Sequence, residues 1–169
     1  MNIAIIIIIQ ALTFIFPAYC ANATPVLVGG GVKIDFGKNF IDGKRLFGNN
    51  KTFRGFFFGW IVGLSVGLVD CYFFNFPLLF AALTPFGALL GDLTAAFLKR
   101  RLNIAPGGML PIVDQIDFVV GAILFSLPLS LIGWTIGWEV AVAVLLFTPP
   151  IHLFTNFCAY KLKLKKHPW

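Results

Sequence analysis

Residues 91–118 read GDLTAAFLKRRLNIAPGGMLPIVDQIDF, and this stretch predicts two membrane-spanning helices joined by a polar loop. Asp92 lies inside an apolar segment that ends in a basic triplet beginning at Lys99. Asp114 and Asp117 follow the loop and stand where the next apolar segment begins. A carboxylate inside a spanning segment costs about 2.5–3.5 kcal/mol on insertion scales, so its default interpretation is functional. The stretch therefore brings three carboxylates and three cations to one membrane boundary.

The spacing within this stretch predicts which charged side chains share a helix face. Asp92 and Lys99 are seven residues apart, which is close to two helical turns, so we expect them on one face. Asp114 and Asp117 are three residues apart and are expected to be neighbours on a helix surface. Between the two helices, Pro106-Gly107-Gly108 predicts a loop.

The composition of the chain requires a lipid environment. It has 169 residues, of which 59% are hydrophobic and 12% charged, and its mean hydropathy is +0.90. A soluble core of this size cannot hide so much apolar surface. We therefore predict an all-α, polytopic integral membrane protein with a single membrane domain over residues 1–169. Its five transmembrane helices are expected at about 3–28, 55–70, 78–98, 116–137 and 139–160.

Details of the apolar segments refine this prediction. Residues 18–23, AYCANA, resemble a signal-peptide cleavage site, but no basic residue precedes the apolar run, so we expect a retained first span. Trp134 and Trp138 are expected to mark the far membrane interface. Pro149-Pro150 is expected to interrupt the fifth span.

The distribution of basic residues predicts the topology. All 13 lysines and arginines fall in the loops 33–54 and 99–115 and in the segment after residue 160, which five spans place on one side. The positive-inside rule makes that side cytoplasmic, with the N-terminus outside and the C-terminus inside. The net charge of +6 thus belongs to membrane edges and indicates no nucleic-acid partner. We expect a multi-pass protein of the cell membrane with its polar site facing the cytoplasm.

Glycines at four-residue spacing predict close helix contacts. They occupy every fourth position of the second span, at Gly55, Gly59, Gly63 and Gly67. In the third span Gly87 and Gly91 repeat the pattern. Small residues at this spacing let helix backbones approach closely in lipid. Gly91 has a second interpretation, in which it clears room beside Asp92 for a bound group.

The charged residues suit phosphoryl or nucleotidyl transfer. Clustered carboxylates repel one another unless they are protonated or bridged by cations. Mg²⁺ takes carboxylate oxygens and keeps positions for substrate phosphates, while lysine and arginine neutralise phosphate oxygens. We therefore predict a Mg²⁺ site at Asp92, Asp114 and Asp117.

Structural alternatives stay open for each group. Asp92 has an alternative role as a hydrogen-bonded residue between helices, and the triplet at Lys99 as a stop-transfer anchor. The alternative role of Asp114 and Asp117 is to place negative charge at a helix N-terminus, where it is favourable. His152 is interpreted as a hydrogen-bonded core residue and not as a catalyst.

The motifs in this order are similar to the signature region of the CDP-diacylglycerol synthase family. GDLTAAFLKRRL, a proline-containing loop and DQIDF match the family's Gly-Asp, its Lys-Arg pair and its two aspartates separated by two residues. The first loop, IDGKRLFGNNKTFRG at 41–55, resembles the motif of the archaeal branch, the CDP-archaeol synthases. The five-span layout also fits that branch, so the resemblance covers nearly the whole chain.

The resemblance implies a reaction and a set of site residues. CTP and 2,3-bis-O-(geranylgeranyl)-sn-glycerol 1-phosphate, an isoprenoid glycerol ether lipid phosphate, would give the CDP-activated lipid and pyrophosphate, with Mg²⁺ as cofactor. Asp92, Asp114 and Asp117 match the acidic metal-site positions and, with Lys99, are the implied catalytic residues. The positions implied for CTP are Lys44, Arg45, Asn50, Lys51, Thr52, Arg54, Gly91, Lys99 and Arg100. A homodimer and the number of metal ions are left open.

The sequence also departs from the bacterial pattern. His-Gly-Gly is missing before the acidic pair, Lys-Asp is missing after the basic pair, and Gln115 stands where Arg is usual. These differences argue against a bacterial diacylglycerol substrate more than against the reaction. Two rival functions remain: a CDP-alcohol phosphotransferase, suggested by Asp42-Gly43, and a small membrane transporter that uses Asp92 as its charge site.

Overall fold

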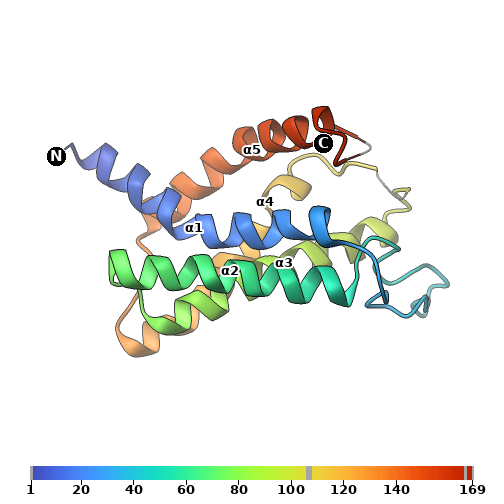
Figure 1. Cartoon of the computed structure of the whole chain (residues 1–169), viewed down its shortest axis with the longest axis horizontal. Coiled ribbons are helices and arrows are strands. Elements are labelled where there is room, and N and C mark those ends of the chain that lie inside the picture. The colour runs from blue at the N-terminus through green and yellow to red at the C-terminus, as the bar shows by residue number, and fades with distance from the viewer. Residues whose placement is uncertain (1, 106–107, 166, 169) are drawn as a thin grey trace.

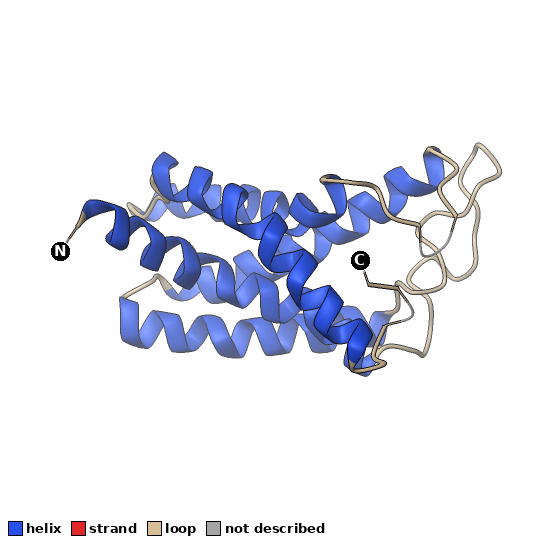
Figure 2. Cartoon of the chain, turned by 90° about the horizontal axis from the view of Figure 1, so that it is seen from above, coloured by secondary structure: helices blue, strands red, loops and turns tan. Residues whose placement is uncertain are grey.

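The protein is a bundle of helices, and its computed structural model describes residues 2–105, 108–165 and 167–168 (Figure 1). Five segments are long and apolar enough to cross a membrane, which confirms the predicted all-α fold with five spans. Helices are the regular elements of the described residues (Figure 2), which otherwise hold only isolated bridges such as the one between Lys33 and Thr52. The elements are α1 (Ile3–Val28), α2 (Phe53–Phe74), α3 (Leu78–Arg101), α4 (Val113–Ser126), the 3₁₀ helix η1 (Leu127–Ile132) and α5 (Trp138–Lys161).

The helix boundaries differ from the predicted ones where local capping and proline act. The second helix starts at Phe53 because the Thr52 hydroxyl accepts a hydrogen bond from the Gly55 amide at 3.1 Å. The fourth helix starts at Val113 and tightens into η1 after Ser126, and η1 ends at Gly133 with a φ of +78°.

One prediction about the C-terminal part of the chain is wrong. The fifth helix runs without a break through Pro149-Pro150, so this pair does not interrupt the span. The ring of Trp134 packs 5.4–6.4 Å from the rings of Phe14, Phe76 and Phe80, and its place at the membrane interface stays a prediction. Trp134 thus belongs to the aromatic core, whereas Trp138 is largely exposed.

Glycines hold the helices at short distance, as their spacing predicts. A Cβ added at Gly59 would lie 2.7 Å from the carbonyl oxygen of Ala21 in α1. One at Gly67 would lie 2.6 Å from the Cα of Ala81 in α3. Helix α2 therefore packs on α1 and α3 through a surface that tolerates no larger residue.

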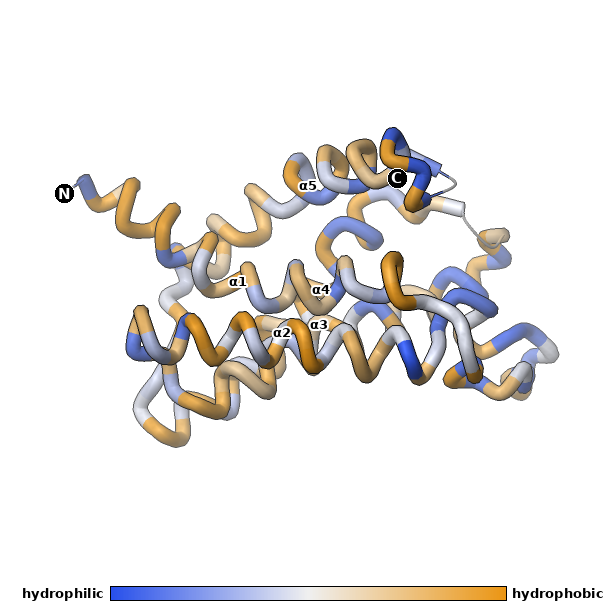
Figure 3. The backbone as a smooth tube through the Cα atoms, in the orientation of Figure 1, coloured by the Kyte–Doolittle hydropathy of each residue, from blue (hydrophilic) through white to orange (hydrophobic). Residues whose placement is uncertain are grey.

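The polar parts of the chain gather at one end of the bundle. The first loop, the α3–α4 connection and the segment after α5 lie together, opposite the N-terminus (Figure 1). Figure 3 shows hydrophilic stretches concentrated at this end and hydrophobic ones along the helices. We call it the polar end. The predicted loop residues Pro106 and Gly107, and Lys166 of the tail, lie outside the described residues.

Candidate active site

A buried carboxylate organises the first loop. The side chain of Asp35 is fully buried and pairs with the Arg45 guanidinium at 2.8 Å. It also accepts hydrogen bonds from the amides of Gly37, Phe47 and Gly48 at 2.9–3.2 Å. Burial opposes the ionised form, but Arg45 and these amides outweigh it and lower the pKa of Asp35 to about 2. The first loop is therefore held in a defined conformation by the contacts of Asp35.

Arg101, at the end of α3, fixes this loop to the helix bundle. Its guanidinium pairs with Asp42 at 2.6 Å and donates to the Arg45 carbonyl at 2.5 Å. It also lies over the rings of Phe40 and Phe97. A second bond joins the loop to the same residue, because the Lys44 ammonium donates to the Arg101 carbonyl at 2.8 Å. The basic triplet thus does more than anchor a span, because its last member positions the first loop.

Two ion pairs join the first loop, α3 and α4 at the polar end. The Lys51 ammonium contacts the Asp92 carboxylate at 2.5–2.6 Å, linking the first loop to α3. Lys99 pairs with Asp114 across the α3–α4 connection and donates to the Gly108 carbonyl at 3.1 Å. Lys99 is therefore paired with Asp114, and Asp92 takes its partner from the loop.

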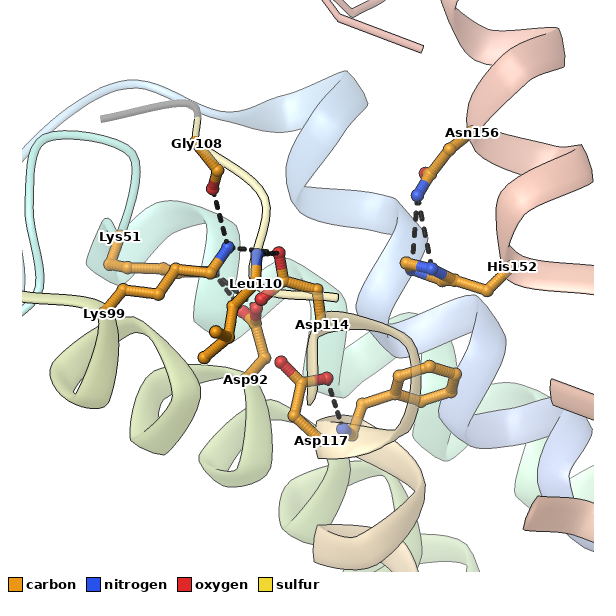
Figure 4. A network of polar contacts seen from close by, with 10 residues as sticks. Lys51, Asp92, Lys99, Gly108, Leu110, Asp114, Asp117, His152 and Asn156 are labelled. Carbon is orange, nitrogen blue, oxygen red and sulfur yellow. Dashed lines mark hydrogen bonds and ion pairs between the residues drawn. The ribbon is translucent and has the colours of Figure 1, made fainter. Parts of the chain in front are cut away.

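The third carboxylate completes a cluster with these pairs. Figure 4 shows Asp117 beside Asp92 and Asp114. Asp117 accepts a hydrogen bond from the Phe118 amide at 2.5 Å. Gly91 packs against the same turn, because a Cβ there would lie 2.2 Å from the Asp117 carbonyl oxygen. This contact supports the packing interpretation of Gly91. The close approach at Gly91 holds the turn of Asp117 against α3, the helix that carries Asp92.

Asp114 lies in the first turn of α4, where negative charge is favourable, but it also makes contacts outside the helix. The residue at the cap position of α4 is Ile112, which makes no side-chain capping bond. Oδ2 of Asp114 accepts from the Leu110 amide at 2.9 Å and pairs with Lys99. Oδ1 of Asp114 is buried and has no hydrogen-bond partner. A buried carboxylate oxygen in this state is costly unless a ligand completes it.

The motif Asn50-Lys51-Thr52 lines a small cavity beside the cluster. The cavity has a volume of about 30 Å³ and is bounded by the first loop, α2 and α3. Gly55, at its α2 side, is closely packed: a Cβ there would lie 3.2 Å from Pro25 and from the Thr52 hydroxyl, so these neighbours would have to shift slightly. The predicted CTP positions 50–52 thus meet Asp92 at one place.

The remaining predicted CTP positions have different surroundings. Lys44 and Arg45 are used inside the loop, as described above. Arg54 is exposed on the first turn of α2. The Nε atom of Arg100 is buried and has no hydrogen-bond partner.

Sequence reasoning did not single out Asp35 or Arg101 as organising residues. Asp35 has a local signal, since Asp-x-Gly is a sequence that favours a side-chain–backbone turn. Arg101 has none, because nothing in the triplet distinguishes the arginine that reaches the loop.

The acidic cluster fits Mg²⁺ when the substrate's phosphates are counted as ligands. Among the described residues, no three His, Cys, Asp or Glu side chains are close enough to hold an ion by themselves. Mg²⁺ is usually bound through one or two carboxylates together with substrate phosphates. The partnerless Oδ1 of Asp114 and the adjacent carboxylate of Asp117 supply such oxygens. The three-carboxylate metal site stays a prediction.

A family model, individual relatives and a solved structure all relate this chain to proteins of archaeal lipid synthesis. Residues 3–169 match the family described as CarS-like, CDP-archaeol synthase. The chain is 44% identical over 167 residues to a CDP-archaeol synthase of Thermofilum pendens, covering 95% of this chain and 80% of that protein. It is 43% identical over 168 residues to one of Pyrococcus furiosus, covering 96% and 98%. A solved structure described as an intramembrane enzyme for archaeal membrane lipids biosynthesis superposes with a TM-score of 0.79 at 35% identity, covering 88% of this chain and 94% of that one.

Proposed function

The chain belongs to the CarS-like family of CDP-archaeol synthases, membrane cytidylyltransferases of archaeal lipid biosynthesis, and we propose that its polar end is where the reaction takes place. The substrates there are CTP and 2,3-bis-O-(geranylgeranyl)-sn-glycerol 1-phosphate. The observation that carries this assignment is the meeting of two lysine–aspartate pairs with Asp117 at one end of the bundle.

The reaction needs positioning and charge neutralisation and no protein nucleophile. An oxygen of the lipid phosphate attacks the α-phosphorus of CTP, a P–O bond forms, and the bond to the β-phosphate breaks to release pyrophosphate. The attacking phosphate is already anionic, so no strong general base is required. Catalysis of this kind depends mainly on in-line placement and electrostatic stabilisation.

Lys51 and Lys99 supply the charge that binds the triphosphate. Each is now held by a carboxylate, and each is only partly exposed at the polar end. When CTP enters, its phosphate oxygens replace the carboxylates as partners of the two ammonium groups. Asp92 and Asp114 are then left with unpaired negative charge beside Asp117.

Asp92, Asp114 and Asp117 would then hold Mg²⁺ together with the phosphates. A bound Mg²⁺ neutralises charge that builds up on the phosphate oxygens as pyrophosphate leaves. The aspartates keep the triphosphate in place by this shared coordination. The site faces the cytoplasm in this proposal, in line with the concentration of basic residues at the polar end.

Neither rival function gains support from the structure. The later aspartates expected of a CDP-alcohol phosphotransferase are absent from the sequence. Asp92, Asp114 and Asp117 lie together at the polar end, whereas carriers usually bind substrate near the bilayer midplane.

Pyrophosphate release from purified protein tests the proposal. We expect release only when CTP, Mg²⁺ and the isoprenoid ether lipid phosphate are all present. In a thermal-shift panel with Mg²⁺, CTP should stabilise the protein more than ATP, GTP or UTP, because a ligand at about 100 times its Kd adds roughly 2.7 kcal/mol. Equal stabilisation by all four nucleotides, or release without Mg²⁺, would contradict it.

A further inference from the structure

The fifth helix carries two polar side chains on the side of the acidic cluster. His152 and Asn156 are four residues apart, about one turn, and both extend from α5 toward the helices that carry the aspartates (Figure 4). The ring of His152 lies 5.7 Å from that of Phe118, the residue after Asp117. Polar residues inside a spanning helix are functional by default.

The contacts of this pair leave its hydrogen-bonding groups adjustable. The Asn156 amide nitrogen lies 3.3 and 3.4 Å from the two ring nitrogens of His152. If the Asn156 amide nitrogen lay along the lone-pair direction of one ring nitrogen, it would be much farther from the other ring nitrogen. The amide therefore points directly at neither of them. Both side chains can therefore turn toward a ligand without losing a strong mutual bond.

The half of α5 that carries this pair stands away from the bundle. Every buried residue of α5 precedes Pro149, and between Ile151 and Lys161, all described by the structure, none is buried. Figure 1 shows these last turns lying apart from α1 and α2. The outward side chains of Leu153, Phe154 and Phe157 are exposed and apolar, as suits contact with lipid chains.

The segment after α5 brings a cation back to the same place. The amides of Leu164 and Lys165 both donate to the Ala159 carbonyl, at 2.9 and 3.4 Å, so the chain turns back at the helix end. Lys165 is half-buried and lies within electrostatic range of Lys51, Lys99, Asp92 and Asp114. Burial, with the two lysines, lowers the pKa of Lys165.

We propose that His152, Asn156 and Lys165 bind the phosphate of the lipid acceptor, on the wall of the cluster opposite the first loop. This assignment rests on the proposed function and divides the site between its two substrates. CTP takes the wall formed by the first loop, where Lys51 and the small cavity lie. The lipid phosphate takes the α5 wall, where the outward side chains Leu153, Phe154 and Phe157 are exposed and apolar.

Electrostatics favour such a second phosphate site. The lipid phosphate must approach the α-phosphate of CTP, and both substrates and the aspartates are negative. Lys51 and Lys99 serve the aspartates or the nucleotide. Lys165 adds a positive charge from a separate segment, and His152 and Asn156 add donors that fix the orientation of the attacking oxygen.

Steady-state kinetics with each substrate varied in turn test this assignment. His152→Leu, Asn156→Leu and Lys165→Met should each raise the KM for the lipid phosphate about tenfold or more, since each removes a hydrogen bond to a charged group. The KM for CTP and the CTP-induced thermal shift should change by less than about twofold. His152→Gln and Lys165→Arg, which keep a donor, should restore most of the lipid affinity. Thr155→Val is the matched control: Thr155 is exposed on the same turn, its hydroxyl donates only to the His152 backbone carbonyl at 3.0 Å, and the variant should behave as the wild type.

The possible outcomes separate this inference from the proposed function. An unchanged lipid KM in all three variants, with the wild type active, would refute the lipid-phosphate site alone. A parallel rise in the KM for CTP, or weaker product inhibition by pyrophosphate, would move these residues to the nucleotide side and also refute it. Absence of CTP-dependent pyrophosphate release in the wild type would instead refute the proposed function. A variant that fails to unfold cooperatively is replaced by its donor-keeping partner at the same position.

Discussion

At the scale of single residues, the polar end is a set of charges that hold one another until substrate arrives. Lys51 neutralises Asp92 and Lys99 neutralises Asp114, whereas Asp117 has the Phe118 amide as its hydrogen-bond donor. Such pairs are only partly exposed, so each charge depends on its partner. In the proposed reaction the same side chains exchange these partners for a triphosphate and its cation.

Removing one carboxylate should stop catalysis without unfolding the protein. We expect Asp114→Asn and Asp117→Asn each to lower kcat at least about 100-fold, because each loses charge that stabilises the metal and phosphates. Asp70→Asn is the matched control: this carboxylate is also buried, but it lies near the other end of α2. Pyrophosphate release and thermal unfolding in detergent measure the two effects. Near-normal rates in both site variants would remove these residues from the metal site.

Acid should open the first loop through Asp35. Its pKa is lowered to about 2, so the stability it contributes is present above its ordinary pKa near 3.8 and is lost as pH falls through about 2. Pepsin cleavage between residues 33 and 52 should therefore be slow at pH 4.5 and about tenfold faster near pH 2, one pKa unit being tenfold. In Asp35→Asn the loop should be cleaved rapidly at both values. A wild-type loop cleaved at equal rates at both values would contradict this account of the loop.

At the scale of elements, the crossing of α3 and α4 sets the distance between the carboxylates. Gly87 and Gly91 of α3 meet Gly121 of α4, where an added Cβ would lie 2.1 Å from the Gly87 carbonyl oxygen. The two helices approach to backbone contact, and Asp92 and Asp117 flank this contact. The packing of the helices and the geometry of the proposed site therefore depend on the same glycines.

A methyl group at Gly91 should disturb both the packing of α3 on α4 and the position of Asp117. Gly91→Ala places a Cβ 2.2 Å from the Asp117 carbonyl oxygen, so the helices must separate. We expect a loss of about 1–3 kcal/mol of stability and a fall in kcat of about tenfold or more, since small misplacements of catalytic groups are expensive. Ser65→Ala, on the exposed face of α2, should change neither. Normal kcat in Gly91→Ala would show that the crossing does not position Asp117.

The helices also show which structural features can be predicted from the sequence and which cannot. Apolar length predicted all five spans, and four-residue glycine spacing predicted the close contacts, because both are local patterns. The pairing of Lys99 with Asp114 was not predicted, since helix spacing favoured Asp92 and only the α3–α4 connection decides the partner. The path of α5 past Pro149-Pro150 was also missed, because a proline pair either breaks a helix or bends it away from its neighbours.

At the scale of the whole molecule, the chain has a polar end and an apolar body. The first loop, the α3–α4 connection and the tail meet there, although more than 100 residues separate the first from the last. A water-soluble nucleotide and a membrane lipid can meet only at such a boundary. The family places the reaction in lipid biosynthesis, and the fold supplies the boundary.

Labelling from each side of the membrane should place the polar end in the cytoplasm. With Cys20, Cys71 and Cys158 replaced by alanine, a single cysteine at Lys38 should react with an impermeant maleimide only after the cells are permeabilised. A cysteine at Thr135, beyond η1, should react in intact cells. The opposite pattern would reverse the topology predicted from the basic residues.

The most direct test of the central claim is an experimental structure of the protein with CTP and Mg²⁺. We predict that Lys51 and Lys99 leave Asp92 and Asp114 and contact the triphosphate, while Mg²⁺ lies between the phosphates and the carboxylates of Asp92, Asp114 and Asp117. A triphosphate bound elsewhere, with both lysine–aspartate pairs intact, would contradict it.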